Sequence, residues 1–419
     1  MKKIRLGVLG ATRGLNYGIS AKKCGLPVEL AAVCDIFTPL MEKVRARLPE
    51  LGLNPEYFSD FTEMLSKADI DAVVIANSAN DHARFSIAAL NAGKHVLSEL
   101  LPVQTLSEAV ALIEAVERSG KVYYYAENYC FWPGILEAVR LFREGMIGDL
   151  ICGECDFVND LAARWHLLTR GIRGHWRNYV PSTCYCTHSI GPMLFALREH
   201  PVRVTGFEVP NQEFLREHGA RCGCAAMEIM QLANGVPLRS THGNLRRPWE
   251  ISMRLTGTKG SLEAGHDFVM FDCPSGDCES PFQRRQMPIR PVDGITDSVS
   301  HDEVAMPLAM FLGQIWNNPE LLPYNIDVFQ ALDMALPGIL AYRSILNGNI
   351  PVAIPDFREK TEREEFRHDN ICTDPGIASG ADLLPSHSFG EITVPDQVYE
   401  KEAARLEKSM KEHFKLGFN

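Results

Sequence analysis

The stretch IRLGVLGATRGLNYGISAKK, residues 4–23, indicates the fold class of this 419-residue chain. Its mainly apolar start, IRLGVL, predicts a buried β-strand, GATRG at 10–14 predicts a tight turn, and the remainder predicts a helix through Lys23. Small residues in such a turn let the backbone approach a pyrophosphate, which binds the amides at the N-terminus of the following helix. Because Thr12 stands where the second glycine of G-x-G-x-x-G would be, the turn alone is equally consistent with a purely structural connection.

Asp35 favours the nucleotide interpretation. It follows Gly10 by 25 residues and ends the strand predicted for VELAAVCD, residues 28–35. A carboxylate at this position accepts hydrogen bonds from the adenosine ribose hydroxyls. The next residues, 36–39, include no arginine that would hold a 2′-phosphate. We therefore expect NAD(H) as the cofactor in preference to NADP(H).

Strands and helices alternate over the first part of the chain. Further strands are predicted at 71–77, 94–99 and 122–128, with a helix before each of the last two. This alternation predicts a parallel sheet with right-handed crossovers. After a helix at 134–148, runs with a period of two predict a second domain on an antiparallel sheet. Helices are expected near 303–316, near 325–347 with a kink at Pro337, and near 397–415.

Composition narrows the class of protein. Hydrophobic residues make up 46% of the chain and charged residues 23%, which are ordinary globular values. The net charge of −11 opposes binding to nucleic acid or to anionic lipid, and no apolar stretch approaches the ~18 residues of a membrane span. Arg13 interrupts the first apolar run, which indicates a strand of a cytoplasmic protein and no signal peptide. Although there are 12 cysteines, no second pair accompanies the C-x-x-C of Cys152 and Cys155, so no metal site is expected.

The sequence YCTHSIGP, residues 185–192, places Tyr185 and His188 three apart, just before an apolar run. In a helix these two side chains would share one face. They are either part of a packed core or carriers of protons in a reaction. Glu127, at the end of a predicted strand, has similar alternatives: it is a base, it holds a substrate hydroxyl, or it caps a helix.

Five short motifs follow one another along the chain: IANSANDH (75–82), AGKHVLSE (92–99), ENYCFWP (127–133), IGDL (147–150) and GTKGSL (257–262). With the N-terminal turn, they resemble the glucose–fructose oxidoreductase/inositol dehydrogenase (Gfo/Idh/MocA) family over roughly residues 4–355. The resemblance implies an α/β protein with an N-terminal Rossmann dinucleotide-binding domain and a C-terminal α+β domain. The second domain would have a large, open, mostly antiparallel sheet that often forms subunit contacts, and the site would lie between the domains. We expect a Rossmann domain at 1–128, a substrate and oligomerisation domain at 129–355, and an extension at 356–419 that ends in a helix.

The chain departs from the usual pattern of that family at two places. Glu99 is followed by Leu100-Leu101-Pro102, so the lysine of the family's Glu-Lys-Pro is replaced by an apolar residue. Cys184 stands four residues before His188, where the family usually has an aspartate. The chain is more similar to a divergent branch, the NAD-dependent α-N-acetylgalactosaminidases, which also lack the lysine.

That branch has a Glu-Asn pair matched here by residues 127–128, and a Tyr-Pro-Thr-His segment matched by residues 185–188. Its Tyr-x-His-Asp and Arg-Pro-Tyr segments correspond to residues 157–160 and 247–249, where Phe157, Asn159 and Trp249 replace the tyrosine, the histidine and the second tyrosine. Because these differences concern substrate contacts, the resemblance does not carry the N-acetylgalactosamine specificity to this chain.

The resemblance implies an enzyme that acts on a sugar or glycoside. It would cleave a glycosidic bond through transient oxidation of a ring hydroxyl, elimination and re-reduction, with NAD regenerated in each cycle. The alternative is a net NAD-dependent sugar or cyclitol dehydrogenase, or a keto-sugar reductase. A nucleotide-binding regulatory protein is a third possibility. The expected partners are a small carbohydrate and further copies of the chain, as a dimer or tetramer.

The candidate residues fall into three groups. The expected catalytic residues are Tyr185, His188 and Glu127. The expected cofactor-binding residues are Gly10, Thr12, Arg13, Gly14, Asp35, Asn77, His82, Glu99 and Asn128, of which His82 and Glu99 are alternatively caps of a helix and a strand. The expected substrate-binding residues are His175, Trp176, Arg177, Asn159 and Trp249, and His166 is a further candidate for sugar or anion contact.

Overall fold

The structure is a computed structural model that describes residues 3–276 and 279–412. The chain forms two compact units, which we describe separately. The first unit runs up to Phe131 and also includes Arg290–Leu332, and the second comprises Trp132–Ile289 and the described residues from Asp333 onwards. The domain boundaries expected from the sequence, at 128 and 355, stay predictions.

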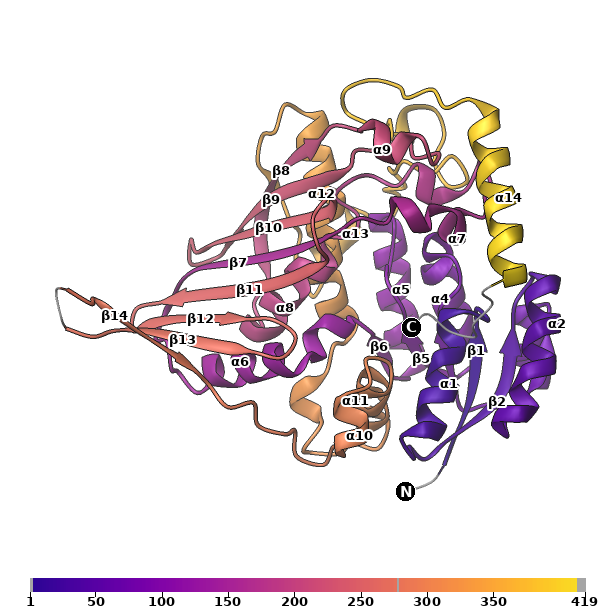
Figure 1. The fold of residues 1–419 in the computed structure, drawn as a ribbon, viewed down its shortest axis with the longest axis horizontal. Helices are drawn as coiled ribbons and strands as arrows, with labels where there is room; N and C mark the ends of the chain where they lie inside the picture. Colours follow the sequence, from indigo (N-terminus) through magenta and orange to yellow (C-terminus); the bar gives the residue numbers. More distant parts are fainter. Residues whose placement is uncertain (1–2, 277–278, 413–419) are drawn as a thin grey trace. The chain divides into compact units, whose positions relative to one another are not determined.

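The first unit is built on a six-stranded parallel sheet with the order β3-β2-β1-β4-β5-β6 (Figure 1). This is the strand order of dinucleotide-binding doubly wound folds. The predicted parallel sheet is therefore confirmed, although β3, which has only three partly exposed residues, was not expected from the sequence. The strands are β1 Ile4–Leu9, β2 Val28–Cys34, β3 Glu56–Phe58, β4 Ala72–Ile75, β5 His95–Ser98 and β6 Tyr123–Tyr125.

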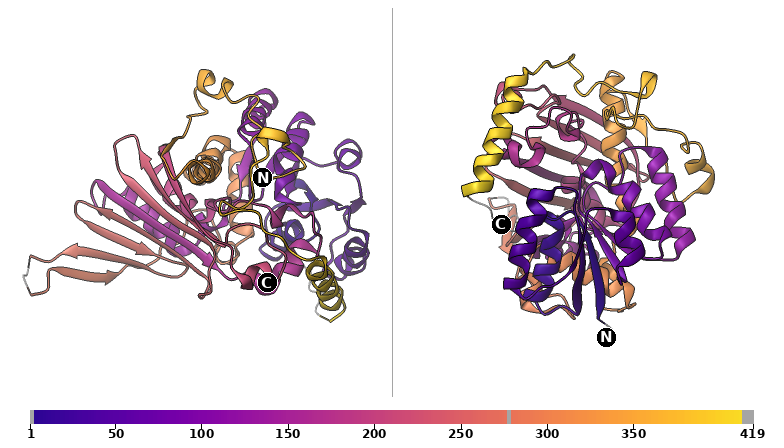
Figure 2. Two further views of the ribbon diagram at one scale, coloured as in Figure 1. Left: turned by 90° about the horizontal axis from the view of Figure 1, so that it is seen from above. Right: turned by 90° about the vertical axis from the view of Figure 1, so that its right-hand side faces the viewer.

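Five helices connect these strands and lie on both sides of the sheet (Figure 2). The helix at SEAVALIEAVERSG is stabilised at both ends: Thr105 and Glu108 form a capping box, and Gly120 ends it with a φ of 61°. Local sequence signals thus determine this element. The helices are α1 Arg13–Lys23, α2 Thr38–Arg47, α3 Phe61–Lys67, α4 His82–Asn91 and α5 Leu106–Ser119.

A late segment of the chain returns to the first unit. It contains α10 (Asp297–Ser300) and α11 (Ala305–Ile315). At the end of β6, the amide of Tyr125 donates a hydrogen bond to the carbonyl of Ile326 at 2.9 Å. The ring of Tyr124 lies 6.2 Å from that of Phe311. Residues around 311–326 therefore cover the β6 edge of the parallel sheet.

The second unit is built on a nine-stranded sheet with the order β14-β13-β12-β11-β7-β10-β9-β8-β15. Every neighbouring pair is antiparallel except β7 and β10, which are parallel. The expected large, mostly antiparallel sheet is confirmed. The strands are β7 Leu150–Asn159, β8 Pro201–Val209, β9 Ala225–Leu232, β10 Pro237–Asn244, β11 Glu250–Gly257, β12 Gly260–Ala264, β13 Val269–Pro274, β14 Phe282–Gln286 and β15 Val352–Ala353.

The two faces of this sheet differ in what covers them. The helices α6 (Pro133–Arg143), α8 (Thr187–Leu197) and α12 (Val328–Leu346) lie on one side of it (Figure 2). The opposite face carries three apolar side chains that are about half exposed: Phe207 at 49%, Met227 at 48% and Ile229 at 51%. Phe207 and Met227 are direct cross-strand neighbours, so these side chains form one patch.

Two helices differ in length from the sequence expectation. The helix expected at 134–148 ends at Arg143, because two glycines with positive φ follow, Gly145 at 80° and Gly148 at 72°. The C-terminal helix expected near 397–415 is α14, Asp396–Glu412, and residues 413–415 lie outside the described residues. Within those described residues, we find no helix with the length and apolar character needed to cross a membrane.

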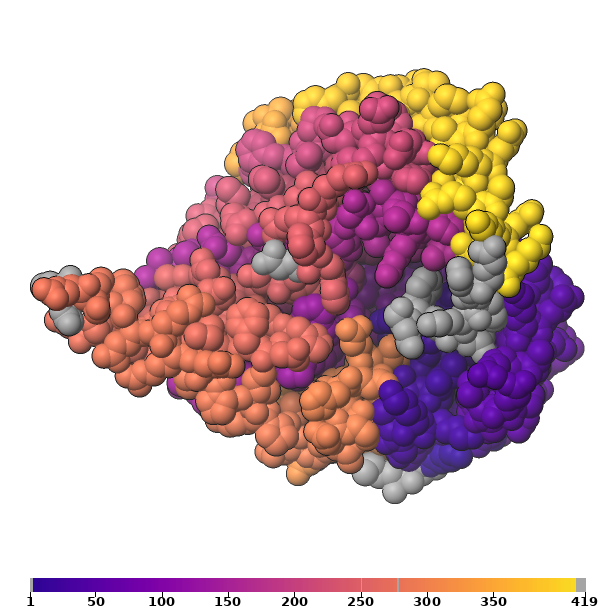
Figure 3. All heavy atoms as spheres, viewed as in Figure 1, coloured from indigo at the N-terminus to yellow at the C-terminus, as the bar shows by residue number. Residues whose placement is uncertain are grey.

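The C-terminal extension folds back onto the second unit, where it covers part of the surface (yellow in Figure 3). Arg343 forms two hydrogen bonds of 2.6 Å with the carboxylate of Asp369. The carboxylate of Glu208 on β8 accepts hydrogen bonds from Ser182 and from the backbone amide of Ser388, at 3.0 and 2.7 Å. The extension between α12 and α14 is therefore anchored by charge-assisted hydrogen bonds.

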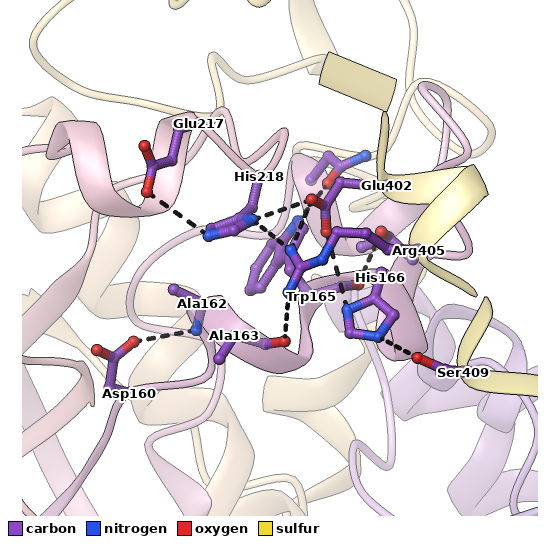
Figure 4. A network of polar contacts seen from close by, with 12 residues as sticks. Asp160, Ala162, Ala163, Trp165, His166, Glu217, His218, Glu402, Arg405 and Ser409 are labelled. Carbon is purple, nitrogen blue, oxygen red and sulfur yellow. Dashed lines mark hydrogen bonds and ion pairs between the residues drawn. The ribbon is translucent and has the colours of Figure 1, made fainter. Parts of the chain in front are cut away.

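A buried carboxylate fixes α14 (Figure 4). Glu402 is fully buried, and its Oε1 accepts from Arg405 at 2.7 Å and lies 3.1 Å from Nδ1 of His218. His166 belongs to the same network, because its Nδ1 lies 3.9 Å from Oε2 of Glu402, and its Nε2 lies 3.1 Å from the hydroxyl of Ser409. His166, which the sequence suggested for sugar contact, thus takes part in holding α14 against α7 (Trp165–Thr169).

Candidate functional site

Two glycines shape the turn between β1 and α1. Gly10 has a φ of 101°, and a Cβ there would lie 2.3 Å from the carbonyl oxygen of Ala76. A Cβ on Gly14 would lie 2.5 Å from Val8, so the helix can pack this close to the strand only with glycine at that position. The missing second glycine, replaced by Thr12, leaves the turn intact. α1 begins directly after it, at Arg13, with its N-terminal amides at the turn.

Asp35 is joined to this turn. Its Oδ2 accepts a hydrogen bond from the amide of Ala11 at 2.8 Å, and its Oδ1 accepts from the amide of Phe37 at 2.8 Å. A carboxylate oxygen has two acceptor positions, so each of these oxygens retains one for a ribose hydroxyl. The carboxylate at the end of β2 therefore lies beside the glycine turn with a fixed orientation, as an adenosine site requires.

Glu99 holds two side chains of α1. Its Oε1 accepts from Arg13 Nε and from the Tyr17 hydroxyl, both at 2.7 Å. Burial by itself raises the pKa of Glu99, but the attraction and hydrogen bond of Arg13, with the Tyr17 bond, hold it below its ordinary value. Glu99 is therefore ionised. The Arg13 side chain, expected to bind the cofactor, is engaged with this carboxylate at the start of α1.

His82 connects the ends of two neighbouring strands. It is buried, with Nδ1 2.8 Å from the carbonyl oxygen of Glu99 and 3.1 Å from that of Leu101. Its Nε2 lies 3.3 Å from the carbonyl oxygen of Asn77. Burial lowers the pKa of His82, although the hydrogen bonds to these carbonyls oppose the shift. A neutral His82 thus positions the loops that follow β4 and β5.

Asn77 and Asn128 follow the ends of β4 and β6. The side-chain oxygen Oδ1 of Asn77 is buried and accepts no hydrogen bond from the described residues. A buried polar atom of this kind calls for a partner, and a bound nucleotide would supply one. Asn128 is buried at 6% exposure beside Glu127, which is fully buried and accepts weakly from the amide of Tyr129 at 3.4 Å. The glycine turn, Asp35 and the orphan oxygen of Asn77 all fit a dinucleotide.

The structure brings Tyr185 and His188 together in the second unit. Tyr185 lies in the turn before α8, and His188 lies in the first turn of that helix. Their rings stack with centroids 6.0 Å apart and an angle of 27° between the planes. Phe157 on β7 packs against the other side of this pair, with its ring 4.4 Å from that of His188. Of the two residues expected on one helix face, only His188 therefore lies in a helix, and Tyr185 lies in the turn before it.

Arg177 joins the same cluster. Its Nη2 donates a hydrogen bond to the Tyr185 hydroxyl at 2.5 Å, and its guanidinium lies 5.0 Å from the centre of the Tyr185 ring. It also stacks on Trp176 at 4.8 Å. Arg177, expected to contact substrate, is thus a direct partner of the tyrosine. Nothing in the sequence spacing of eight residues indicated this pair.

A short turn at 176–178 holds Arg177 in place. His175 caps it, with Nδ1 accepting from the amide of Arg177 at 3.2 Å. Burial, with the positive charges of Arg177 and Arg170, lowers the pKa of His175 to about 4, so the imidazole is a neutral acceptor. Asn178, which the sequence did not single out, is fully buried and accepts from the indole of Trp165 at 2.9 Å.

Two expected substrate residues lie elsewhere in this unit. Asn159 ends β7, opposite Asn244, and its carbonyl accepts from the amide of Leu245 at 2.8 Å. Trp249 packs edge-on against Trp132, with ring centroids 5.3 Å apart, and Trp132 contacts His266 in the same way at 4.7 Å. Trp249 is 53% exposed, so its indole is available to a ligand.

A buried polar pair lies behind α8, and no pattern in the sequence indicated it. Glu228 and His242 are both fully buried, with Nε2 of His242 3.8 Å from Oε1 of Glu228. Burial raises the pKa of Glu228 well above its ordinary value and lowers that of His242 to about 4, so both are neutral. Ser240 links His242 to Ser189 on α8 through contacts of 3.2 and 2.6 Å.

Comparison with known proteins agrees with this geometry. Residues 4–127 match the Gfo/Idh/MocA family model, described as an oxidoreductase family with an NAD-binding Rossmann fold. A glycosyl hydrolase family 109 protein of Solibacter usitatus is 23% identical, with 84% of this chain and 88% of that protein covered. An alpha-N-acetylgalactosaminidase of Bacteroides fragilis is 24% identical, with 79% and 86% covered.

A solved structure shares the fold. The inositol dehydrogenase homologue of Azotobacter vinelandii, crystallised with NADH and myo-inositol, matches with a TM-score of 0.66 and 18% identity. The match covers 84% of this chain and 98% of that one. The expected combination of a Rossmann domain and a second mixed-sheet domain is thereby confirmed, as is NAD as the cofactor of the N-terminal domain. Residues 4–127 are thus similar to the Gfo/Idh/MocA oxidoreductase family, and most of the chain is similar to family 109 glycosyl hydrolases and an alpha-N-acetylgalactosaminidase.

Proposed function

We propose that this protein is an NAD-dependent enzyme that cleaves a glycosidic bond through transient oxidation of a ring hydroxyl. The relatives named as family 109 glycosyl hydrolases and alpha-N-acetylgalactosaminidase support this activity, and they match over most of the chain. The single observation that carries the proposal is the stacked pair of Tyr185 and His188 with Arg177 on the tyrosine hydroxyl. Two proton carriers side by side are what an oxidation followed by an elimination requires.

The turn at Gly10 and the carboxylate of Asp35 would hold NAD, which would supply a hydride acceptor for a carbinol carbon of the sugar and a hydride donor at the end of the cycle. Tyr185 takes the proton of the hydroxyl group that becomes the carbonyl. The carbonyl acidifies the C–H bond on the adjacent carbon, and His188 removes that proton. The bond to the leaving group one carbon further on then breaks, and the aglycone departs with a proton from the site. Water adds to the resulting double bond, and the return of hydride and proton restores the hydroxyl, so the net reaction is hydrolysis.

Other residues would bind and orient the sugar. Glu127 is fully buried, and a carboxylate in such surroundings accepts strongly from a hydroxyl. The sugar would stack on the exposed indole of Trp249 and on Trp176, and His175 would supply a hydrogen bond. Because residues 157–160 and 247–249 differ from the α-N-acetylgalactosaminidase pattern, we propose a sugar other than N-acetylgalactosamine.

A glycoside panel supplied without external NAD tests the proposal. The purified protein should release free sugar over many turnovers while no NADH accumulates. In a parallel reaction with added NAD, accumulation of one NADH per sugar without release of the aglycone would instead establish the alternative, a net sugar or cyclitol dehydrogenase. Reduction of a keto-sugar by added NADH would identify the reductase form of that alternative. If no glycoside of the panel is hydrolysed or oxidised, the proposal is rejected for this class of substrate.

We further propose that the protein is a homodimer or homotetramer formed through the nine-stranded sheet. The support is the patch of Phe207, Met227 and Ile229 on the face opposite α6, α8 and α12. Contiguous exposed apolar side chains on a sheet face favour burial against a second copy.

A further inference from the structure

We propose that Arg177 is the residue that keeps Tyr185 in its basic, phenolate form during the reaction. The inference deepens the proposed function and rests on it for the substrate, because Tyr185 is the group that takes the hydroxyl proton. Sequence patterns assign Arg177 to sugar binding, whereas the geometry points to a direct electrostatic role on the tyrosine oxygen.

The guanidinium is held in place on several sides. The turn at 176–178 is capped by His175 and anchored by Asn178, which is fully buried and bonded to Trp165. From this turn, Arg177 lies over two aromatic rings, 4.8 Å from Trp176 and 5.0 Å from Tyr185. Stacking on both rings limits the rotamers of a side chain that is otherwise flexible. The hydrogen bond to the tyrosine oxygen is therefore pre-formed.

The contact is short and charge-assisted. Arg177 Nη2 lies 2.5 Å from the Tyr185 hydroxyl oxygen. Within residues 3–276 and 279–412, no carboxylate forms an ion pair with Arg177, so its positive charge is directed at this oxygen. An opposite charge at this distance stabilises the ionised form of an acid and typically lowers its pKa by about 1–3.

Three titratable groups near the 176–185 segment are uncharged at neutral pH. Burial keeps the pKa of His175 at about 4 and raises the pKa of the Cys184 thiol, so neither bears a charge at neutral pH. The buried Glu228, which faces Cys184 from β9, is a neutral acid because its pKa is well above the ordinary value. His188 stacks on the tyrosine ring 6.0 Å away. Arg177 is thus a permanent positive charge in direct contact with the tyrosine oxygen.

Titration of tyrosinate absorbance in the NAD-bound protein tests the inference without any substrate. In the wild type, one tyrosine should ionise at least about one pH unit below the rest, and Tyr185→Phe should remove that transition. Arg177→Gln should move it upward by about one unit or more, and Arg177→Lys should restore part of the difference. Burial moves the pKa of six other tyrosines upward, away from this transition. They are Tyr17, Tyr57, Tyr123, Tyr129, Tyr342 and Tyr399.

Arg221→Gln is a matched control. Arg221 donates to the hydroxyl of Tyr179 at 3.3 Å in the same unit, so it is an Arg–Tyr pair outside the proposed chemistry. Replacement of Arg221 should leave the low-pH tyrosine transition unchanged. An Arg177→Gln titration that superimposes on the wild type, in a protein with unchanged circular dichroism, would overturn the inference.

Kinetics on a hydrolysed glycoside give an independent readout. In Arg177→Gln, the acidic limb of the kcat profile should shift to higher pH by about one unit or more, with activity recovering at alkaline pH and KM little changed. In the Tyr185→Phe background, Arg177→Gln should add no further loss. A raised KM with an unmoved pH profile would mean that Arg177 only binds sugar, which contradicts the inference. If no glycoside is hydrolysed, the proposed function fails, and the absorbance titration still decides the role of Arg177.

Discussion

Asp35 accepts the backbone amide of Ala11 at 2.8 Å, so the carboxylate at the end of β2 and the turn after β1 form one structure. The same carboxylate is held from its other side by the amide of Phe37. Two fixed hydrogen bonds orient the remaining acceptor positions toward a ligand. The acidic residue therefore has a defined geometry before any nucleotide binds, which reduces the entropy lost on binding.

Removal of the Asp35 carboxylate should weaken NAD binding. We expect Asp35→Ala to cost about 1–3 kcal/mol, the value of a charge-assisted hydrogen bond, and Asp35→Asn to cost less because it retains an acceptor for Ala11. Calorimetry with NAD and NADP measures both variants. Asp69→Ala, at an exposed position, is the control. Tighter binding of NADP than of NAD by the wild type would contradict the assignment.

Tyr185→Phe and His188→Ala should each reduce turnover by at least about 10²-fold, the lower range of general acid–base catalysis. NAD affinity and melting temperature should change little, because both residues lie in the second unit and Asp35 lies in the first. A glycoside deuterated at the carbon next to the oxidised one should exchange its label with solvent during wild-type turnover. Full retention of deuterium together with an active Tyr185→Phe enzyme would exclude the elimination route.

Glu402→Gln should loosen α14. The change leaves Arg405 without its carboxylate and removes a buried charge-assisted hydrogen bond, so we expect a loss of about 1–3 kcal/mol in unfolding free energy. Urea unfolding measures the loss, and limited proteolysis reports on the helix itself. Glu407→Gln, on the exposed side of the same helix, should have no effect. Equal stability of the two variants would show that the buried network does not hold α14.

His242 and His175 should make the protein less stable in acid. Both have a folded-state pKa of about 4, against about 6.5 for an unfolded histidine. Between these values only the unfolded chain takes up the proton, so this contribution is complete above pH 6.5 and is lost as the pH falls toward 4. Each group contributes a slope of at most about 1.4 kcal/mol per pH unit.

Urea unfolding of His242→Gln between pH 7.5 and 4.5 checks this slope. Glutamine can form a hydrogen bond with Ser240 as the imidazole does, but it does not titrate. Its acid-side slope should therefore be smaller than that of the wild type. Glu228 has the opposite sign, because its folded pKa is raised: its contribution is complete below about 4.5 and is lost as the pH rises. Glu228→Gln should then gain relative stability toward neutral pH, and parallel pH profiles for all three proteins would refute the assignment.

Light scattering should find a dimer or tetramer at micromolar concentration. Phe207→Asp places a charge in the apolar patch of the sheet and should dissociate the assembly, whereas Phe389→Asp, at a comparably exposed aromatic residue of the extension, should not. A monomeric wild type would contradict the proposed use of this sheet face.

The sequence alone determined the nucleotide-binding half of this protein. Its signals are local: a buried strand, a turn with Gly10 and Gly14, and an acidic residue at the end of the next strand. Periodicity and turn chemistry act over a few residues, so the parallel sheet and the mostly antiparallel second sheet could be predicted from them. The three-residue strand β3 was missed because so short a segment has no measurable period.

Only the tertiary structure decided which side chains act together. The Arg177–Tyr185 hydrogen bond joins two turns, and the His218–Glu402 contact joins residues 184 positions apart. Likewise, His82 turned out to bind backbone carbonyls, and His166 to contact Ser409 on α14. Such contacts depend on how irregular turns and a distant helix pack, and on which polar groups burial leaves in need of a partner. No repeating pattern in the sequence records that requirement, because it arises only when the folded chain removes those groups from water.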